Sequence, residues 1–225
     1  MNTDSQRLQQ VSEEFQRMVE EFFLVQSRYS AAIKEIQTKL EILDDEFQMR
    51  HRRNPIHHMQ SRLKTIQSML EKLKRKNYEV SINSAVKNLQ DIAGIRVICS
   101  YVQDVYTIAN LLVSQDDVHL VRMADYIREP KPNGYRSLHL IVEIPVFLSE
   151  GRILVPVEVQ IRTIAMDFWA SLEHSLRYKA QEYIPQHISD ELQRVATDIA
   201  SLDQRMQAIH DQVDELSDAH GDNAT

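Results

Sequence analysis

Apolar side chains recur every three or four residues through the first 50 positions, which is the spacing of one face of an α-helix. This stretch contains neither Gly nor Pro, and Pro55 follows it. We therefore predict a long amphipathic helix, broken at most once, as an N-terminal arm over residues 1–54. Its apolar positions are Val11, Phe15, Met18, Phe22, Val25, Tyr29, Ile33, Ile36, Leu40, Leu43 and Phe47.

The last part of the chain has the most regular pattern. Its apolar positions alternate steps of four and three, and sustained heptads of this kind pack against a partner helix. We predict an oligomerising heptad helix within residues 184–225, whose partner is either the N-terminal helix or another subunit. The heptad positions are Ile188, Leu192, Val195, Ile199, Leu202, Met206, Ile209, Val213 and Leu216.

The segment after Pro55 is predicted to form a second helix with two different faces. An apolar stripe docks on a core, while polar and cationic side chains point outward. The stripe consists of Leu63, Ile66, Leu70 and Leu73, and the other face carries Lys64, Ser68, Lys72 and Arg75.

From residue 92 onward the pattern is that of a mixed α/β unit. Runs rich in β-branched residues predict strands, and Glu150-Gly151 predicts a hairpin turn between the last two of them. The predicted strands cover residues 92–101, 119–127, 137–147 and 153–161, and the predicted helices cover residues 104–113 and 165–180. The fold class is therefore α+β, with its central domain at residues 55–183.

Composition adds a charge asymmetry to this picture. The net charge is -7, yet nine Lys or Arg residues stand against the single acid Glu71 between positions 50 and 76. A confined basic cluster in an acidic chain favours a small anionic ligand over a surface that coats DNA, although a solvated helix face is the plainer interpretation. With one cysteine, no signal peptide and no membrane-length apolar run, we expect a cytoplasmic protein.

Four glycines are too few and too scattered for a phosphate-binding glycine loop. If the protein binds phosphates, it must do so with Arg and Lys side chains and a metal ion. In the predicted last strand, Glu158, Gln160 and Arg162 share one face, opposite apolar Val159 and Ile161. Such a polar face is costly unless it lines a site, and the alternative is an ordinary half-exposed sheet.

A second carboxylate, Asp91, precedes the first predicted strand of this unit, which continues to Arg96. Asp91 either caps a turn or pairs with Glu158, and two converging carboxylates can hold Mg²⁺ against nucleotide phosphates. At 131–139 a Pro-Asn-Gly turn leads into a strand. There Tyr135 and His139 share one face, so that Tyr135 is either an exposed platform for a base or a packed aromatic. Trp169 and Cys99 are expected to be core residues.

Together these segments resemble the synthetase domain of the RelA/SpoT family, and more narrowly its small stand-alone alarmone synthetases. The resemblance covers roughly residues 55–180. It rests on SRLK at 61–64, DIAGIRV at 91–97, DYI at 125–127, PKPNGYRSLH at 130–139, EVQIRT at 158–163 and AMDFWASLEHSLRYK at 165–179. It implies a nucleotidyltransferase-like fold with a mixed sheet of about five strands, flanked by helical arms that form a homotetramer.

The resemblance also implies an activity: a Mg²⁺-dependent transfer of pyrophosphate from ATP to the ribose 3′-hydroxyl of GDP or GTP, and possibly GMP, without a hydrolase domain. Asp91 and Glu158 would be catalytic and bind the metal. ATP would be held by Arg62, Lys64, Lys72 and Arg96. The guanine nucleotide would be held by Lys131, Tyr135, His139, Gln160 and Asp167.

Three features depart from the family pattern, and one of them is Asp167, where relatives often have Asn. Ala124 stands where many members have a basic residue, so one phosphate contact is missing or is supplied by Arg122 or Arg128. His58 and Gln60 replace a Phe and a Thr found in product-activated members, so product activation is not expected. Two other functions remain open: a toxin that pyrophosphorylates the 3′ end of tRNA, and a non-catalytic oligomer that binds a nucleotide or RNA.

Overall fold

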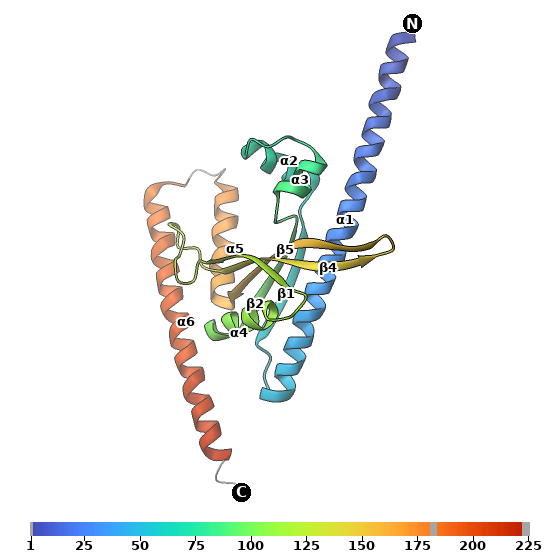
Figure 1. Cartoon of the computed structure of the whole chain (residues 1–225). Helices are drawn as coiled ribbons and strands as arrows, with labels where there is room; N and C mark the ends of the chain where they lie inside the picture. Colours follow the sequence, from blue (N-terminus) through green and yellow to red (C-terminus); the bar gives the residue numbers. More distant parts are fainter. Residues whose placement is uncertain (1, 181–183, 222–225) are drawn as a thin grey trace.

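A five-stranded mixed sheet lies at the centre of the computed structural model, which describes residues 2–180 and 184–221 (Figure 1). The strand order is β1-β2-β5-β4-β3, with β2 and β5 parallel and the other neighbours antiparallel. The strands are β1 (Ile56–Leu63), β2 (Ala93–Cys99), β3 (His119–Asp125), β4 (Leu138–Leu148) and β5 (Gly151–Thr163). The expected α+β class and the mixed sheet of about five strands are confirmed.

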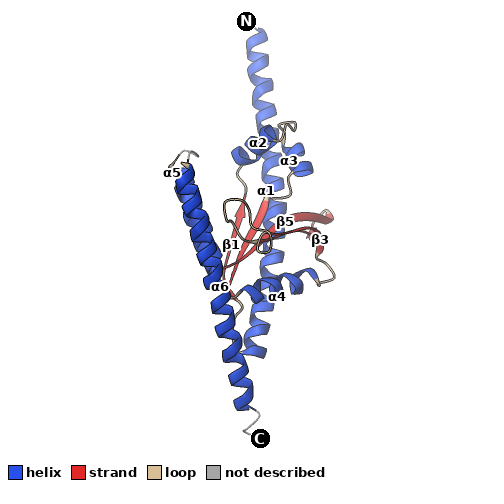
Figure 2. Cartoon of the chain, turned by 90° about the vertical axis from the view of Figure 1, so that its left-hand side faces the viewer, coloured by secondary structure: helices blue, strands red, loops and turns tan. Residues whose placement is uncertain are grey.

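Helices flank this sheet, and the two longest lie near opposite ends of the chain (Figures 1 and 2). The helices are α1 (Asn2–His51), α2 (Ile66–Arg75), α3 (Ile82–Asn88), α4 (Val102–Val113), α5 (Ile164–Lys179) and α6 (Gln186–Gly221). No helix in the described part of the chain is both long and apolar enough to cross a membrane.

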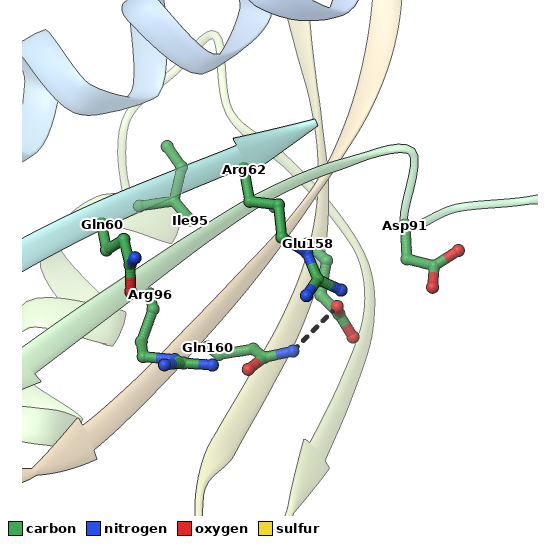
Figure 3. A pocket seen from close by; sticks show the side chains of 8 residues that line it. Gln60, Arg62, Asp91, Ile95, Arg96, Glu158 and Gln160 are labelled. Carbon is green, nitrogen blue, oxygen red and sulfur yellow. Dashed lines mark hydrogen bonds between the residues drawn. The ribbon is translucent and has the colours of Figure 1, made fainter. Parts of the chain in front are cut away.

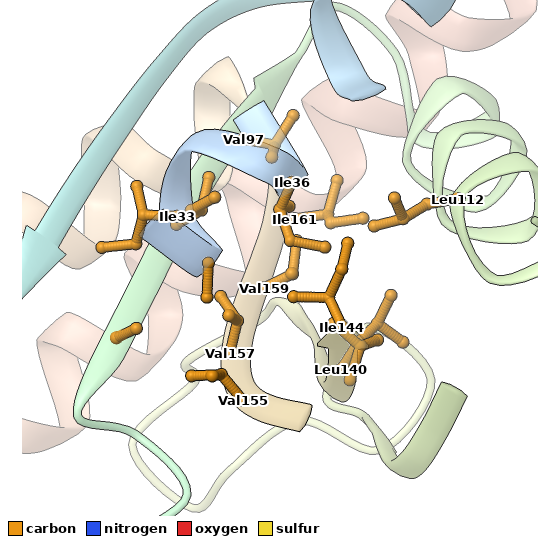
Figure 4. Packing of buried hydrophobic residues seen from close by; sticks show 14 of the residues in the cluster. Ile33, Ile36, Val97, Leu112, Leu140, Ile144, Val155, Val157, Val159 and Ile161 are labelled. Atoms are coloured by element: carbon orange, nitrogen blue, oxygen red, sulfur yellow. The ribbon is translucent and has the colours of Figure 1, made fainter. Parts of the chain in front are cut away.

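The main core lies between one face of the sheet and helices α1 and α4. β5 alternates along its length, so that Val157, Val159 and Ile161 meet Ile33 and Ile36 of α1 (Figure 4). Each of these side chains is at most 7% exposed, and full burial of one such side chain contributes about 1.5–3 kcal/mol to folding. The packed face therefore holds the sheet rigid, and the opposite face is left for chemistry.

Helix α1 is part of this core as well as an arm. Its residues from Val25 to Leu43 bury an apolar stripe against the sheet, at the three- and four-residue spacing predicted. The side chains of Val11, Phe15 and Met18, which belong to the same predicted stripe, lie outside the described residues.

The prediction of a helix directly after Pro55 is wrong for its first half. Residues Ile56–Leu63 form β1, an edge strand antiparallel to β2. Most of its side chains are exposed, so it lacks the alternation that marks a half-buried strand, and its conformation depends on pairing with β2. The helical spacing came from Ile66, Leu70 and Leu73, which do lie on α2. Helix α3 was not anticipated.

Helix α6 packs along α5 and against α4 rather than on α1. Leu192, Ala196 and Ile199 surround Trp169 of α5, whose indole nitrogen donates to the Leu192 carbonyl at 3.0 Å. Trp169 is thus a core residue, as expected. Further along α6, the buried Asp203 carboxylate accepts a 2.6 Å hydrogen bond from the Thr163 hydroxyl at the N-terminus of α5.

Replacing Asp203 by asparagine is expected to stabilise the fold at neutral pH. Burial raises the pKa of Asp203 above its ordinary 3.8, despite the hydrogen bond from Thr163. A carboxyl with a raised pKa contributes stability that is complete below 3.8 and is lost as pH rises through the raised value. Asparagine retains an acceptor for Thr163 without a buried charge.

The thermal midpoint of Asp203→Asn should therefore exceed that of the wild type by a few degrees at pH 7, and the gap should narrow at pH 4. Asp198→Asn, an exposed change on the same helix, serves as the control. A lower midpoint for Asp203→Asn at pH 7 would mean that the ionised carboxylate holds α6 in place.

Candidate active site

The face of the sheet opposite the main core carries the predicted site residues. In the register of the strands, Gly94 lies between Arg62 of β1 and Glu158 of β5, and Arg96 lies between Gln60 and Gln160. These residues line an open cleft of about 240 Å³ together with Asp91 (Figure 3). The structure therefore brings both carboxylates and two of the predicted cations to one place.

Asp91 lies just before β2 and is bound by two lysines. Lys64, which follows β1, and Lys72 of α2 each donate to Asp91 Oδ2 at 2.5 Å. Burial acts to raise the pKa of Asp91, but the two lysines outweigh it and the pKa is lowered. Lys64 is not on the helix predicted for it, yet it reaches the same point as Lys72.

The other oxygen, Asp91 Oδ1, is buried without a hydrogen-bond partner within the described residues. An unpaired buried acceptor is costly, and a carboxylate with one free oxygen suits a cation or a donor from a ligand. Three or more clustered His, Cys, Asp or Glu residues that could hold a metal by themselves do not occur in the described part of the chain. Mg²⁺ commonly takes only one or two carboxylates plus substrate phosphates, so Asp91 and Glu158 fit this ion.

Glu158 is tied to the neighbouring strand β4. Its Oε1 lies 3.4 Å from His139 Nδ1, and its Oε2 accepts from Gln160 at 2.9 Å. Burial acts to raise the pKa of Glu158, but His139 and Gln160 outweigh it, so the pKa is lowered. Glu158 is therefore ionised at neutral pH.

The direction of the hydrogen bonds around His139 follows from the groups at each end. Arg162 can only donate, and its Nη2 lies 2.6 Å from the Tyr135 hydroxyl. Tyr135 in turn lies 2.8 Å from His139 Nε2, and ionised Glu158 can only accept. In a neutral imidazole whose Nδ1–H faces Glu158, Nε2 accepts from the Tyr135 hydroxyl. The chain runs from Arg162 through Tyr135 and His139 to Glu158.

The loop before β4 fixes Tyr135 by two turn residues. Asn133 accepts from the Tyr135 backbone N–H at 3.2 Å, and Gly134 has a φ of 88°. A Cβ at Gly134 would also lie 2.5 Å from the Cβ of Ala196 on α6, so only glycine fits. Tyr135 is half-buried, between the two alternatives left open for it, and its hydroxyl is bonded within the site. The Lys131 ammonium lies 4.8 Å from the centre of its ring.

Arg162 is the functional residue that the sequence placed on the site face without giving it a role. It is 4% exposed and donates to Gln160, Tyr135 and Asp167. Asp167 Oδ1, on α5, also lies 3.5 Å from Arg96. A buried guanidinium with this many partners orients them all. The signal that could have revealed it is the uninterrupted polar alternation from position 158 to 162.

A second cleft adjoins the first and shares Asp91 and Glu158 with it. Its walls include Lys72 of α2, Lys76 directly after α2, and Arg122 of β3. Arg128, the other cation considered as a substitute at Ala124, instead points outward and is 78% exposed beside Asp125. The structure thus brings Arg122 to the site and leaves Arg128 out, while Ala124 pairs with His139 across β3 and β4.

Cys99 does not belong to the site. It is fully buried at the end of β2, and burial raises the pKa of its thiol. A protonated, inaccessible thiol cannot act as a nucleophile, so the prediction of a core residue is confirmed.

Known proteins are similar to this chain in both sequence and fold. Residues 61–183 match the family described as the region found in RelA / SpoT proteins. GTP pyrophosphokinase YwaC of Bacillus subtilis is 45% identical over 186 residues, which cover 83% of this chain and 89% of the relative.

Solved structures agree with the sequence comparison. Small alarmone synthetase 2 from B. subtilis superposes with a TM-score of 0.74 at 43% identity, covering 82% of this chain and 96% of that chain. Small alarmone synthetase 1 from B. subtilis, bound to its product pppGpp, gives 0.75 at 37% identity, with 82% and 94% covered.

Two adjoining clefts that are lined by Arg and Lys side chains and share a pair of carboxylates define a protein suited to phosphorylated substrates. The matches in sequence and in structure then make the identity specific. The chain belongs to the RelA/SpoT family.

Proposed function

We propose that this chain is a GTP pyrophosphokinase, which transfers pyrophosphate from ATP to the ribose 3′-hydroxyl of GDP or GTP and releases AMP. The observation that carries the proposal is the position of Asp91 and Glu158 on one face of the sheet, between the cations near β1 and α2 and the group of side chains on β4, β5 and α5. A reaction that joins two nucleotides needs both substrates to meet at one centre. Membership of the RelA/SpoT family and similarity to a named GTP pyrophosphokinase support the same reaction.

We assign the donor to the β1–β2 side of the site. Arg62 and Arg96 line the first cleft and present planar guanidinium groups to adenine, while Lys64 and Lys72 meet at Asp91, where they would bind the phosphates. Burial lowers the pKa of Lys64, although the nearby Asp91 opposes this shift. An incoming triphosphate would compensate the two ammonium groups more fully than one carboxylate does.

We assign the acceptor to the β4–α5 side. Tyr135 would stack on guanine, and Asp167 would accept from the N–H groups of its edge through Oδ2, since Oδ1 is shared by Arg162 and Arg96. Lys131 and His139 would meet the phosphates, and Gln160 would face the ribose. His139 is engaged at both nitrogens, so it would give up one partner to do so.

The reaction then needs positioning more than covalent chemistry. The 3′-oxygen attacks the β-phosphorus of ATP while the bond from that phosphorus to the oxygen of the departing AMP breaks. Glu158, ionised and bonded to His139, accepts the hydroxyl proton. Arg and Lys side chains around the clefts stabilise the charge that develops on the transferred group. Mg²⁺, held by Asp91 and Glu158, would add further charge stabilisation on the phosphates.

The apolar surface of the helices supports a homo-oligomer, which we propose to be a tetramer. On α6 the heptad positions that do not touch α5 remain exposed, and α5 adds further apolar side chains on its outer side. Exposed patches of this kind mark protein–protein contacts. Ile188, Val195, Leu202, Met206, Ile209, Phe168, Leu172 and Leu176 are each at least 39% exposed.

Product analysis tests the proposed reaction. The purified chain is incubated with ATP, Mg²⁺ and, in separate reactions, GMP, GDP, GTP or deacylated tRNA, and the products are resolved by anion exchange. We expect AMP in equal amounts with a guanosine nucleotide that carries a 3′-pyrophosphate. AMP formed only with tRNA would assign the chain to tRNA modification, and no AMP with any acceptor would remove the enzymatic proposal.

Tyr135→Ala is expected to raise the KM for GTP, because it removes the surface on which guanine stacks. Loss of one base–aromatic stack corresponds to a change of roughly tenfold to a hundredfold. The KM for ATP should be nearly unchanged, as measured from initial rates of AMP release. Tyr178→Ala, a tyrosine that is 82% exposed on α5, is the matched control. An equal rise in the KM of both nucleotides would place Tyr135 elsewhere in the mechanism.

A further inference from the structure

A further cavity of about 330 Å³ is lined by none of the predicted active-site residues. Its walls come from the middle of α1, from α3 and the residues after it, and from the outer parts of β4 and β5. In Figure 1 these elements meet beside the β4–β5 hairpin, where α1 passes it. This volume is within the range of pockets that bind small organic molecules.

Tyr29 contributes the most informative side chain of this cavity. It is only 3% exposed, yet its hydroxyl has no hydrogen-bond partner in the described part of the chain. Unlike the enclosed unpaired atoms of the active site, this hydroxyl is accessible from the cavity that Tyr29 lines, so a ligand there can accept its hydrogen bond. Burial also raises the pKa of Tyr29 to about 12, so the hydroxyl stays protonated and can donate.

The charged side chains around Tyr29 also form no ion pair with another described residue. They are Arg28 of α1, Lys87 of α3 and Glu143 of β4, which line the cavity. Two cations against one acid leave the cavity with a net positive charge. Apart from Gln90, the rest of the wall is apolar and includes Leu89, Leu154 and Val155.

We propose that this cavity is a second ligand site, which binds a small organic anion with an apolar or aromatic body. Arg28 and Lys87 bind the anionic group, Tyr29 donates a hydrogen bond to the ligand, and the apolar wall covers its body. The site is distinct from the catalytic clefts but adjoins one of them. Leu89 and Gln90 line both this cavity and the cleft that contains Asp91.

The test uses 8-anilinonaphthalene-1-sulfonate, an aromatic anion of suitable size whose fluorescence rises when it is bound. The full chain is titrated without nucleotide, and the Kd is compared among variants. Lys87→Glu and Arg28→Glu should each weaken binding about tenfold, as expected for a charge-assisted contact. Tyr29→Phe should weaken it about threefold without lowering the thermal midpoint, because the hydroxyl has no partner within the described fold.

Two control variants locate the probe. Lys34→Glu makes the same charge change at an exposed position of α1 and should leave the Kd unchanged. Arg62→Glu alters the first catalytic cleft and should also leave it unchanged. Equal affinity for wild type and Lys87→Glu, weakening by Arg62→Glu alone, or no saturable binding would each overturn the proposal. None of these readouts depends on pyrophosphate transfer.

Discussion

Asp91→Asn should lower kcat for pyrophosphate transfer by ~10³-fold, the order expected when a centre of charge stabilisation on a transferring phosphoryl group is lost. The amide has nearly the shape of the carboxylate but no charge. It would leave Lys64 and Lys72 close together without their shared counter-ion, and it would remove the buried oxygen that faces the cleft. The rate of AMP release at saturating ATP and GTP measures this change.

The same variant needs a check that the fold survives. The salt bridges lost with Asp91 are partly buried, so some loss of stability is expected, and a thermal midpoint measured beside the rate separates the two effects. A variant that is folded and inactive supports the assignment. Folded protein with a kcat within tenfold of the wild type would remove Asp91 from the catalytic centre.

Glu158→Gln is expected to lower kcat by ~10²–10⁴-fold, which is the usual contribution of a general base. Glutamine can still contact Gln160 and His139, but it cannot accept a proton at neutral pH. The KM for ATP should change little, because the donor is bound mainly by groups on β1, β2 and α2. Single-turnover rates with each nucleotide at saturation give the cleanest measure.

Glu143→Gln is the matched control for this experiment. Glu143 lies on the adjacent strand β4, where it pairs with Pro156 of β5, and Glu143→Gln makes the same change of charge away from the catalytic clefts. Its kcat should equal that of the wild type. A similar fall in both variants would indicate that net charge, and not the carboxylate of Glu158, sets the rate.

The hydrophobic pattern correctly predicted the helices and strands that bury one face and expose the other. Helix α1, helix α6 and strands β2, β4 and β5 each bury a face, so their period of 3.6 or 2 appears in the sequence. β1 was predicted as a helix and α3 was not predicted at all, and the reasons differ. β1 is an edge strand with few buried side chains, and α3 spans only Ile82–Asn88, less than two full turns.

The candidate site could be predicted as a set of residues but not as a network. Alternation in β5 placed Glu158, Gln160 and Arg162 on one face, and the register with β2 and β4 confirms that they share it with Arg96 and His139. The partners of each side chain depend on strand order. Since β2 and β5 are parallel neighbours far apart in sequence, no local pattern could show that Arg96 approaches Asp167.

Gly94 limits what can enter the first cleft. It lies between Arg62 and Glu158 in the sheet, and a Cβ built there would meet only backbone oxygens at 3.8 Å, which is ordinary contact. A larger residue would therefore fold without backbone strain and project into the cleft. A single-base substitution in the codon of Gly94 gives alanine or valine, and either residue could alter which nucleotides the cleft accepts. Such a change would narrow the cleft while every charge of the site stayed in place.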